Sequence, residues 1–140
     1  MKIPKLNPEE QELLWKSICD YAYYQTLAVN LRYYPSNRVE NRPVPIGMLD
    51  MWGREVRLFA DIPYDPFTEI RLLLRPISSM TVEEYDEYSS YDCSTIYDDG
   101  KLISNGGGTD WLMSHYFDYR GLIEKGLALE APEKIYKDRL

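Results

Sequence analysis

The stretch "TEIRLLLRPISSMTVEE", residues 68–84, contains the change from strand to helix on which the fold class of this chain depends. Its first part, Thr68–Leu74, is a nearly continuous apolar run, which predicts a buried strand. Arg75 and Pro76 end that strand, because proline has no amide hydrogen for the next rung of a sheet ladder.

The second part of the stretch predicts the start of a helix. Thr81 is a helix-capping residue, and Glu84 follows three positions later, where a capping box places its carboxylate. We expect a short helix over about residues Val82–Ser89. A buried strand followed by a helix, with further strands and helices on either side, predicts an α+β fold.

Upstream, residues 7–10 (Asn-Pro-Glu-Glu) predict the start of an N-terminal helix. Asn7 can cap this helix, Pro8 suits its first position and Glu10 completes a second capping box. Four apolar residues then recur at helical spacing, which predicts one buried stripe: Leu14, Trp15, Ile18 and Ala22. The helix is expected to end near residues 23–25.

Three more strands are predicted between this helix and Thr68. Thr26–Tyr33 alternates apolar and polar residues, whereas Ile46–Met51 and Val56–Ala60 flank a glycine-containing turn, as in a hairpin. A proline-rich loop occupies residues 34–45. We expect these three strands and Thr68–Leu74 to form one mostly antiparallel sheet, with the N-terminal helix packed on it.

Downstream of the second helix, residues 95–104 (TIYDDGKLIS) predict a hairpin, because Asp99-Gly100 is a strong signal for a tight turn. Gly126 predicts the left-handed end of one further helical turn, and residues 127–129 are expected to be extended. We expect residues 1–140 to form a single domain, with short helices near the C-terminus.

Gly106–Gly108 precedes another predicted helix, capped by Thr109 or Asp110 and continuing to about Phe117. Glycines before a helix can cradle a phosphate through their amide groups. A phosphate-binding loop also needs a lysine and a hydroxyl directly after the glycines, whereas Asp110 would repel a phosphate. We therefore interpret the glycines as a flexible connector.

The charge of the chain is unevenly distributed. The net charge is −7, from 23 acidic and 16 basic residues. Residues 83–100 contain seven acidic residues and no lysine or arginine, so the remainder of the chain has 16 of each sign. Such a chain does not favour nonspecific binding to nucleic acid or to an anionic membrane.

This acidic, tyrosine-rich segment is our candidate surface for a protein partner. Its acidic side chains could attract a basic partner or mimic the phosphates of a nucleic acid, whereas the simpler alternative is a solvated helix face and hairpin tip. The candidate partner-binding residues are Glu83, Glu84, Tyr85, Asp86, Glu87, Tyr88 and Asp92. The segment lacks the ligand spacing of a calcium-binding loop.

A second candidate site surrounds the proline-rich loop. Arginines can bind phosphate and tyrosine rings can stack on a base, so this set could hold a nucleotide: Arg32, Tyr33, Arg38 and Arg42. Ordinary solvated arginines in a loop are the alternative, because nothing in the spacing specifies a bidentate geometry.

The chain has one histidine, His115. With Asp110 or Asp118 it could act as a general base, but one histidine without a nearby pair of thiols is a poor zinc site. The spacing of His115 and Trp111 also suits a packed helix face. Because no common catalytic motif occurs, we predict no catalytic residue, no metal ligand and no cofactor.

The compartment is predicted from absences in the sequence. No apolar run approaches the ~20 residues of a membrane span, and the first residues do not resemble a secretory signal. Cys19 and Cys93 are isolated thiols, which favours the reduced state. We expect a cytoplasmic protein.

Two stretches resemble small, uncharacterised proteins of phages and mobile elements of gut anaerobes. The first, "LLLRPISSMTVEEYDEY", is similar to the family pattern LRP-SSMT-EE. The second, "DWLMSHYFDYRGLIEKGLALEAPEKIY", is similar to the pattern DWLN-HHFDYRGLI--GLALEAP, and "QELLWKSIC" is similar to the N-terminal helix of that family. In the second pattern Met113 replaces a polar residue, and Ser114 stands where that family commonly shows a further histidine or a small residue. This departure weakens the idea of a catalytic histidine pair.

The resemblance implies a phage or mobile-element context, hence a bacterial host cell, and implies no activity. Our first hypothesis is a non-enzymatic accessory binding protein that blocks a host defence protein through the acidic segment. The alternatives are a protein that sequesters a nucleotide and an enzyme that uses His115. The sequence leaves the partner's identity and the oligomeric state open.

Overall fold

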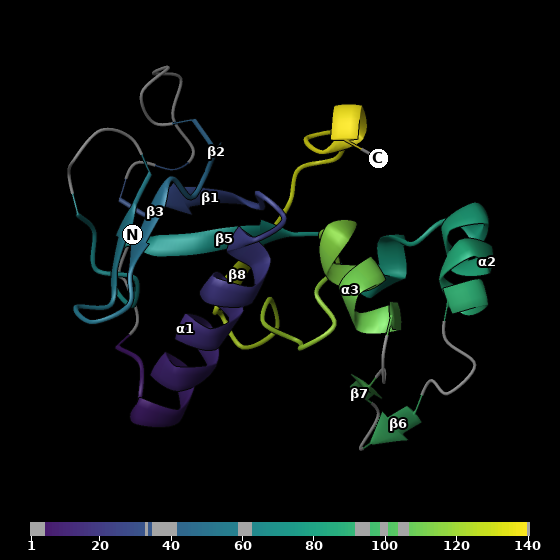
Figure 1. Ribbon diagram of the computed structural model, residues 1–140, viewed down its shortest axis with the longest axis horizontal. Coiled ribbons are helices and arrows are strands. Elements are labelled where there is room, and N and C mark those ends of the chain that lie inside the picture. The colour runs from purple at the N-terminus through teal and green to yellow at the C-terminus, as the bar shows by residue number, and fades with distance from the viewer. Residues whose placement is uncertain are drawn as a thin grey trace. The chain divides into compact units, whose positions relative to one another are not determined.

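The computed structural model describes residues 5–32, 34, 42–58, 63–91, 96–98, 101–103 and 107–139. They form an α+β fold with an N-terminal helix, a mostly antiparallel sheet, two small hairpin sheets and two later helices (Figure 1). The chain forms two compact units, Met1–Leu73 and Leu74–Leu140. The expectation of a single domain stays a prediction.

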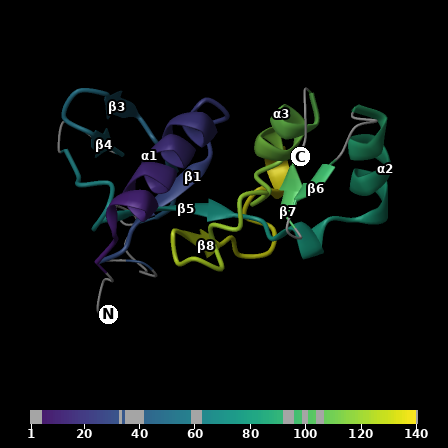
Figure 2. The same ribbon diagram turned by 90° about the horizontal axis from the view of Figure 1, so that it is seen from below.

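The first unit begins with helix α1, Pro8–Ala22. The predicted capping box is confirmed: the Asn7 amide donates to Glu10 Oε1 at 3.0 Å, and the Glu10 amide donates to Asn7 Oδ1 at 2.8 Å. The apolar stripe is also confirmed, since three of its members are buried: Leu14, Trp15 and Ile18. Helix α1 lies beside strands β1, Leu27–Asn30, and β5, Ile70–Leu74, in both views (Figures 1 and 2).

The main sheet has the strand order β2-β1-β5-β8, where β2 is Val44–Pro45 and β8 is Ala128–Glu130. Strand β1 pairs antiparallel with β2 and with β5, with Ala28 opposite Val44 and Leu72. All five residues of β5 are buried, which confirms the buried strand predicted from the apolar run.

The predicted membership of the sheet is wrong. The expected hairpin exists, with β3, Met48–Asp50, opposite β4, Glu55–Arg57, but these strands form a separate two-stranded sheet. Strands β2 and β8 complete the main sheet instead. Both are only two or three residues long, so neither has enough sequence to show a strand pattern.

Strand β1 is shorter and more deeply buried than the alternating pattern predicts. Ala28 is buried together with Leu27 and Val29, so both faces of this strand are covered. The strand ends at Asn30, because its side chain accepts a hydrogen bond from the Arg32 amide at 2.9 Å and turns the chain.

The second unit contains a 3-10 turn η2, Ile77–Ser79, helix α2, Val82–Tyr91, and a hairpin of β6, Ile96–Asp98, and β7, Lys101–Ile103. The hairpin is confirmed by its register, with Tyr97 opposite Leu102. Asp99 and Gly100 themselves lie outside the described residues.

Helix α3, Gly107–Ser114, begins earlier and ends earlier than predicted. The expectation that Thr109 or Asp110 caps this helix is wrong, because Gly107 and Gly108 already belong to its first turn. Its C-terminal end has the two hydrogen bonds of a Schellman motif, Phe117 amide to Leu112 carbonyl at 2.9 Å and Tyr116 amide to Met113 carbonyl at 3.0 Å.

Tyr116 therefore takes the left-handed position that glycine usually occupies, with φ of 66°. Its ring stacks on Tyr136 with 3.9 Å between centroids, just before the last 3-10 turn η3, Lys137–Arg139. The same motif recurs at Gly126, φ 75°, where Leu127 and Gly126 donate to the carbonyls of Leu122 and Ile123. This second end confirms the prediction for Gly126.

Within the described residues, no helix is both long and apolar enough to cross a membrane.

Candidate functional site

Six of the seven candidate partner-binding residues lie on helix α2, which begins at the predicted capping box. The Glu84 amide donates to Thr81 Oγ1, and the Thr81 amide donates to Glu84 Oε1, both at 3.1 Å. Four of the candidates are exposed to solvent: Glu83, Tyr85, Asp86 and Glu87. Val82 and Tyr85 add apolar surface, being 74% and 59% exposed. We call these five residues, Val82, Glu83, Tyr85, Asp86 and Glu87, the outer face of α2.

Tyr88 lies on the opposite side of the helix and is only 4% exposed. Its ring is 5.5 Å from that of Trp111, centroid to centroid, in a buried cluster that includes Leu112 and Phe117. Helices α2 and α3 pack against each other through this cluster. The prediction that Tyr88 belongs to a docking surface is corrected, because an aromatic ring at this position packs where the two helices meet.

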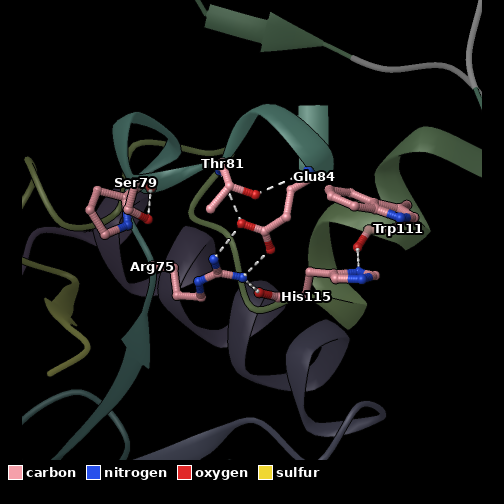
Figure 3. Close-up of polar contacts among 7 residues, drawn as sticks. Arg75, Ser79, Thr81, Glu84, Trp111 and His115 are labelled. Carbon is pink, nitrogen blue, oxygen red and sulfur yellow. Dashed lines mark hydrogen bonds and ion pairs between the residues drawn. The ribbon is translucent and has the colours of Figure 1, made fainter. Parts of the chain in front are cut away.

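Glu84 also points inward, toward Arg75 at the end of β5 (Figure 3). The two guanidinium nitrogens of Arg75 donate to the two carboxylate oxygens of Glu84, each at 2.8 Å. Arg75 Nη1 also donates to the His115 carbonyl oxygen at 3.1 Å, and the guanidinium lies 4.1 Å from the centroid of the Phe117 ring. One side chain thus joins the start of α2 to the end of α3.

The Arg75–Glu84 pair is largely shielded, with side chains 15% and 16% exposed. Burial alone would raise the pKa of the Glu84 carboxyl, but the hydrogen bonds from Arg75 and Thr81 and the charge of Arg75 outweigh it and lower the pKa. Glu84 is therefore an ionised anchor of the helix, and its place in the predicted docking surface is corrected accordingly. Asp92, the remaining candidate, lies outside the described residues.

The His115 ring lies against Trp111 and faces backbone and aromatic groups (Figure 3). Its ring stacks on Trp111 at 4.0 Å between centroids, and its Nδ1 lies 2.9 Å from the Trp111 carbonyl oxygen and 3.1 Å from Ser114 Oγ. These contacts match the packed helix face that was the alternative to catalysis.

Asp118 is not arranged as the orienting partner of His115. Its two carboxylate oxygens accept hydrogen bonds from the amides of Leu122 and Ile123, at 2.8 and 2.9 Å. The carboxylate therefore caps the turn that ends at Gly126. Within the described residues, no group of three or more side chains is arranged to hold a metal ion.

The second candidate site is only partly described. Arg32 and Arg42 are both exposed, whereas Tyr33 and Arg38 lie outside the described residues. The nucleotide-binding hypothesis for this loop therefore stays a prediction.

A hollow of about 440 Å³ adjoins Arg75 in the second unit, and it is lined by residues of η2 and of the C-terminal segment. Its charged side chains have both signs: Glu130, Glu133, Lys134 and Lys137. Arg75 also lines this hollow, but its charge is already paired with Glu84. The other charged side chains of the lining have both signs, so the lining does not favour a ligand of one charge.

Sequence reasoning missed two arginines. Arg75 was interpreted only as the end of a strand, because its contact with Glu84, nine residues later, has no local signal in the sequence. Arg71 is 1% exposed in β5, and its Nη1 donates to the carbonyls of Phe67 and Ile70 at 3.0 and 2.8 Å. Its burial lowers its pKa.

Comparison with protein-family models, curated proteins and solved structures found no match for this chain.

Proposed function

We propose that this chain is a non-enzymatic binding protein that docks a basic protein partner through the outer face of α2. The observation that supports this proposal is the sorting of side chains on one short helix. Glu84 and Tyr88 are used to hold the helix, whereas Glu83, Asp86 and Glu87 are displayed to solvent. A helix held on one side can present its charges to a partner without first becoming ordered, which lowers the entropic cost of binding.

The charge of the whole chain supports the same surface. The net charge of −7 equals the charge of the segment in which α2 lies, so long-range attraction would guide a basic partner toward this segment. Tyr85 and Val82 supply apolar contact area between the acidic residues, and tyrosine is enriched at the centres of protein interfaces.

The finer form of the proposal concerns the biological setting. The motif resemblance implies a phage or mobile-element protein in the cytoplasm of a bacterial host, and a host defence protein is then the proposed target. Blocking requires only that the bound protein cover a basic functional surface, so it needs no catalytic group on this chain.

The test is charge reversal of the outer face with the anchor left intact. A triple variant, Glu83→Lys, Asp86→Lys and Glu87→Lys, is compared with the unmodified chain in affinity purification from infected cells with quantitative mass spectrometry. We expect the principal captured protein to be basic and its recovery to fall at least about tenfold, since like charges at an interface cost several kcal/mol.

A matched control changes the net charge equally but elsewhere. The variant Glu124→Lys, Glu133→Lys and Asp138→Lys alters three exposed residues outside α2. It should keep the captured partner. Equal loss in both triple variants would mean that only the net charge matters, and undiminished capture by the α2 variant would remove the outer face from the proposal.

A further inference from the structure

The first unit contains a hollow of about 430 Å³ beside the β3–β4 hairpin. This volume falls in the range of small-molecule sites, roughly 300–1,000 Å³. The turn of the hairpin and the segment at residues 63–67 supply its lining, which includes Trp52, Arg54, Glu55, Tyr64, Asp65 and Phe67.

Three of these lining residues are aromatic, and Trp52 is 100% exposed. The turn is held in shape by Asp50, whose Oδ1 accepts hydrogen bonds from the amides of Trp52 and Gly53, both at 3.0 Å. A fully solvated indole on an ordered turn offers an aromatic face to a ligand, and the face of an aromatic ring attracts cations, that of tryptophan most strongly.

Two carboxylates, those of Glu55 and Asp65, line the same hollow next to an antiparallel bridge. Val56 and Tyr64 form an antiparallel bridge, with the Val56 amide 3.0 Å from the Tyr64 carbonyl oxygen and the Tyr64 amide 2.8 Å from the Val56 carbonyl oxygen. Glu55 and Asp65 directly precede and follow the bridged residues, and Asp65 Oδ1 also accepts a hydrogen bond from the Phe67 amide at 2.9 Å. Like charges that line one hollow repel each other, so a positive charge bound there would relieve their repulsion.

The basic residue of the lining is directed elsewhere. Arg54 Nη1 lies 2.6 Å from Glu12 Oε1 on helix α1. Arg54 is thus paired with a carboxylate of α1, whereas Glu55 and Asp65 contribute two negative charges to the lining. Because no three-ligand metal group occurs among the described residues, an organic cation suits this lining better than a metal ion.

We propose that this hollow binds an alkylammonium cation, through the face of Trp52 and the charges of Glu55 and Asp65. Aromatic faces next to carboxylates are the chemistry that recognises quaternary ammonium groups and alkylated lysines. The site is independent of the outer face of α2, since its residues belong to the other unit.

Tryptophan fluorescence of the full chain provides the first test. Trp15 and Trp111 are buried, so ligand-dependent changes should come mainly from Trp52. Choline is titrated against its uncharged isostere, 3,3-dimethylbutan-1-ol, in parallel with adenosine monophosphate. We expect a saturable change with choline and affinity at least about tenfold weaker for the alcohol. Equal affinity for choline and the alcohol, or tighter binding of adenosine monophosphate, would overturn the proposal, as would no saturation with choline up to about 100 mM.

The second test uses variants and a titration that does not depend on fluorescence. By calorimetry, Glu55→Gln should weaken choline binding about threefold to tenfold and Trp52→Ala should reduce it at least tenfold. Glu83→Gln, the same charge change on α2, should leave the affinity unaltered. All three residues reach solvent, and thermal unfolding confirms that each variant folds. Equal affinities of Glu55→Gln and Glu83→Gln would rule out the carboxylate contribution and with it the proposed site.

A final pair of ligands distinguishes a free metabolite from a protein side chain. Nα-acetyl-trimethyllysine amide presents a trimethylammonium group, and Nα-acetyl-lysine amide presents a primary ammonium group, each on a peptide-like group. Binding at least as tight as that of choline indicates a side chain of a protein as the source, and weaker binding of both indicates a free ammonium compound.

Discussion

Helices α1 and α2 begin in the same way and are held in place differently. Each starts with a reciprocal capping box, Asn7 with Glu10 and Thr81 with Glu84. Helix α1 then buries a broad face that includes Leu14, Trp15 and Ile18, so apolar burial holds it.

Helix α2 has no comparable apolar face among its described side chains. It is held by the Tyr88 ring against Trp111 and by the carboxylate of Glu84 on Arg75. The difference teaches that two specific contacts can fix a helix while its other described side chains are exposed to solvent. Such a helix is suited to display charge, whereas α1 is suited to build a core.

The largest expected effect comes from removing an α1 core residue. Leu14 is 0% exposed, so Leu14→Ala should lower the free energy of unfolding by about 2–5 kcal/mol, the usual range for a buried leucine. Urea denaturation followed by circular dichroism measures the loss. Lys16→Ala, an exposed change in the same helix, should stay within about 0.5 kcal/mol; a similar loss in both variants would contradict core burial as the stabilising term.

The next effect comes from the anchor of α2. Arg75→Met should cost about 1–3 kcal/mol, because Glu84 loses its charge-assisted hydrogen bonds while still half-buried. The double variant with Glu84→Met should recover much of the loss, since the unpaired carboxylate is then gone. Chemical denaturation of the four chains gives the coupling free energy, and a value near zero would show that the pair does not hold the helix.

The two capping boxes should contribute about equally to the free energy of unfolding. Asn7→Ala and Thr81→Ala should each cost about 1 kcal/mol, because each leaves an amide of the first helical turn without its side-chain acceptor. Thr81→Ser keeps the hydroxyl and serves as the control for α2. A much larger loss at Thr81 than at Asn7, in thermal or chemical unfolding, would mean that Glu84 needs the cap to reach Arg75.

The smallest expected effect is the part of the pH dependence of stability that Glu84 contributes. The pKa of Glu84 is lowered in the folded chain, so the stability it contributes is present above the unfolded pKa of about 4.3 and is lost as the pH falls through the lower folded value. Glu84→Gln should remove this part of the slope below about pH 5. An unchanged slope in that variant would assign the acid sensitivity to other carboxylates.

Local sequence signals accounted for much of the secondary structure. Both capping boxes and the left-handed end at Gly126 were predicted correctly, because each depends on residues within one turn of each other. The end of α3 at Tyr116 could not be predicted, since a tyrosine in the left-handed region is supported by stacking on Tyr136, twenty positions later. Strand β2 escaped prediction for a similar reason, because pairing with another strand defines it. The extended backbone at residues 127–129 was predicted, but not that β8 joins the main sheet.

The same distinction between local and tertiary information applies to the candidate docking surface. The sequence by itself determined that the net charge lies in residues 83–100 and that a helix starts after Thr81. Only the tertiary structure decided which side chains of that helix face outward. Glu83 and Glu84 are adjacent and chemically identical, yet one is exposed and the other is bound to Arg75. Their roles differ because a helix turns about 100° per residue, so the position of Arg75 selects one carboxylate and leaves the other for solvent.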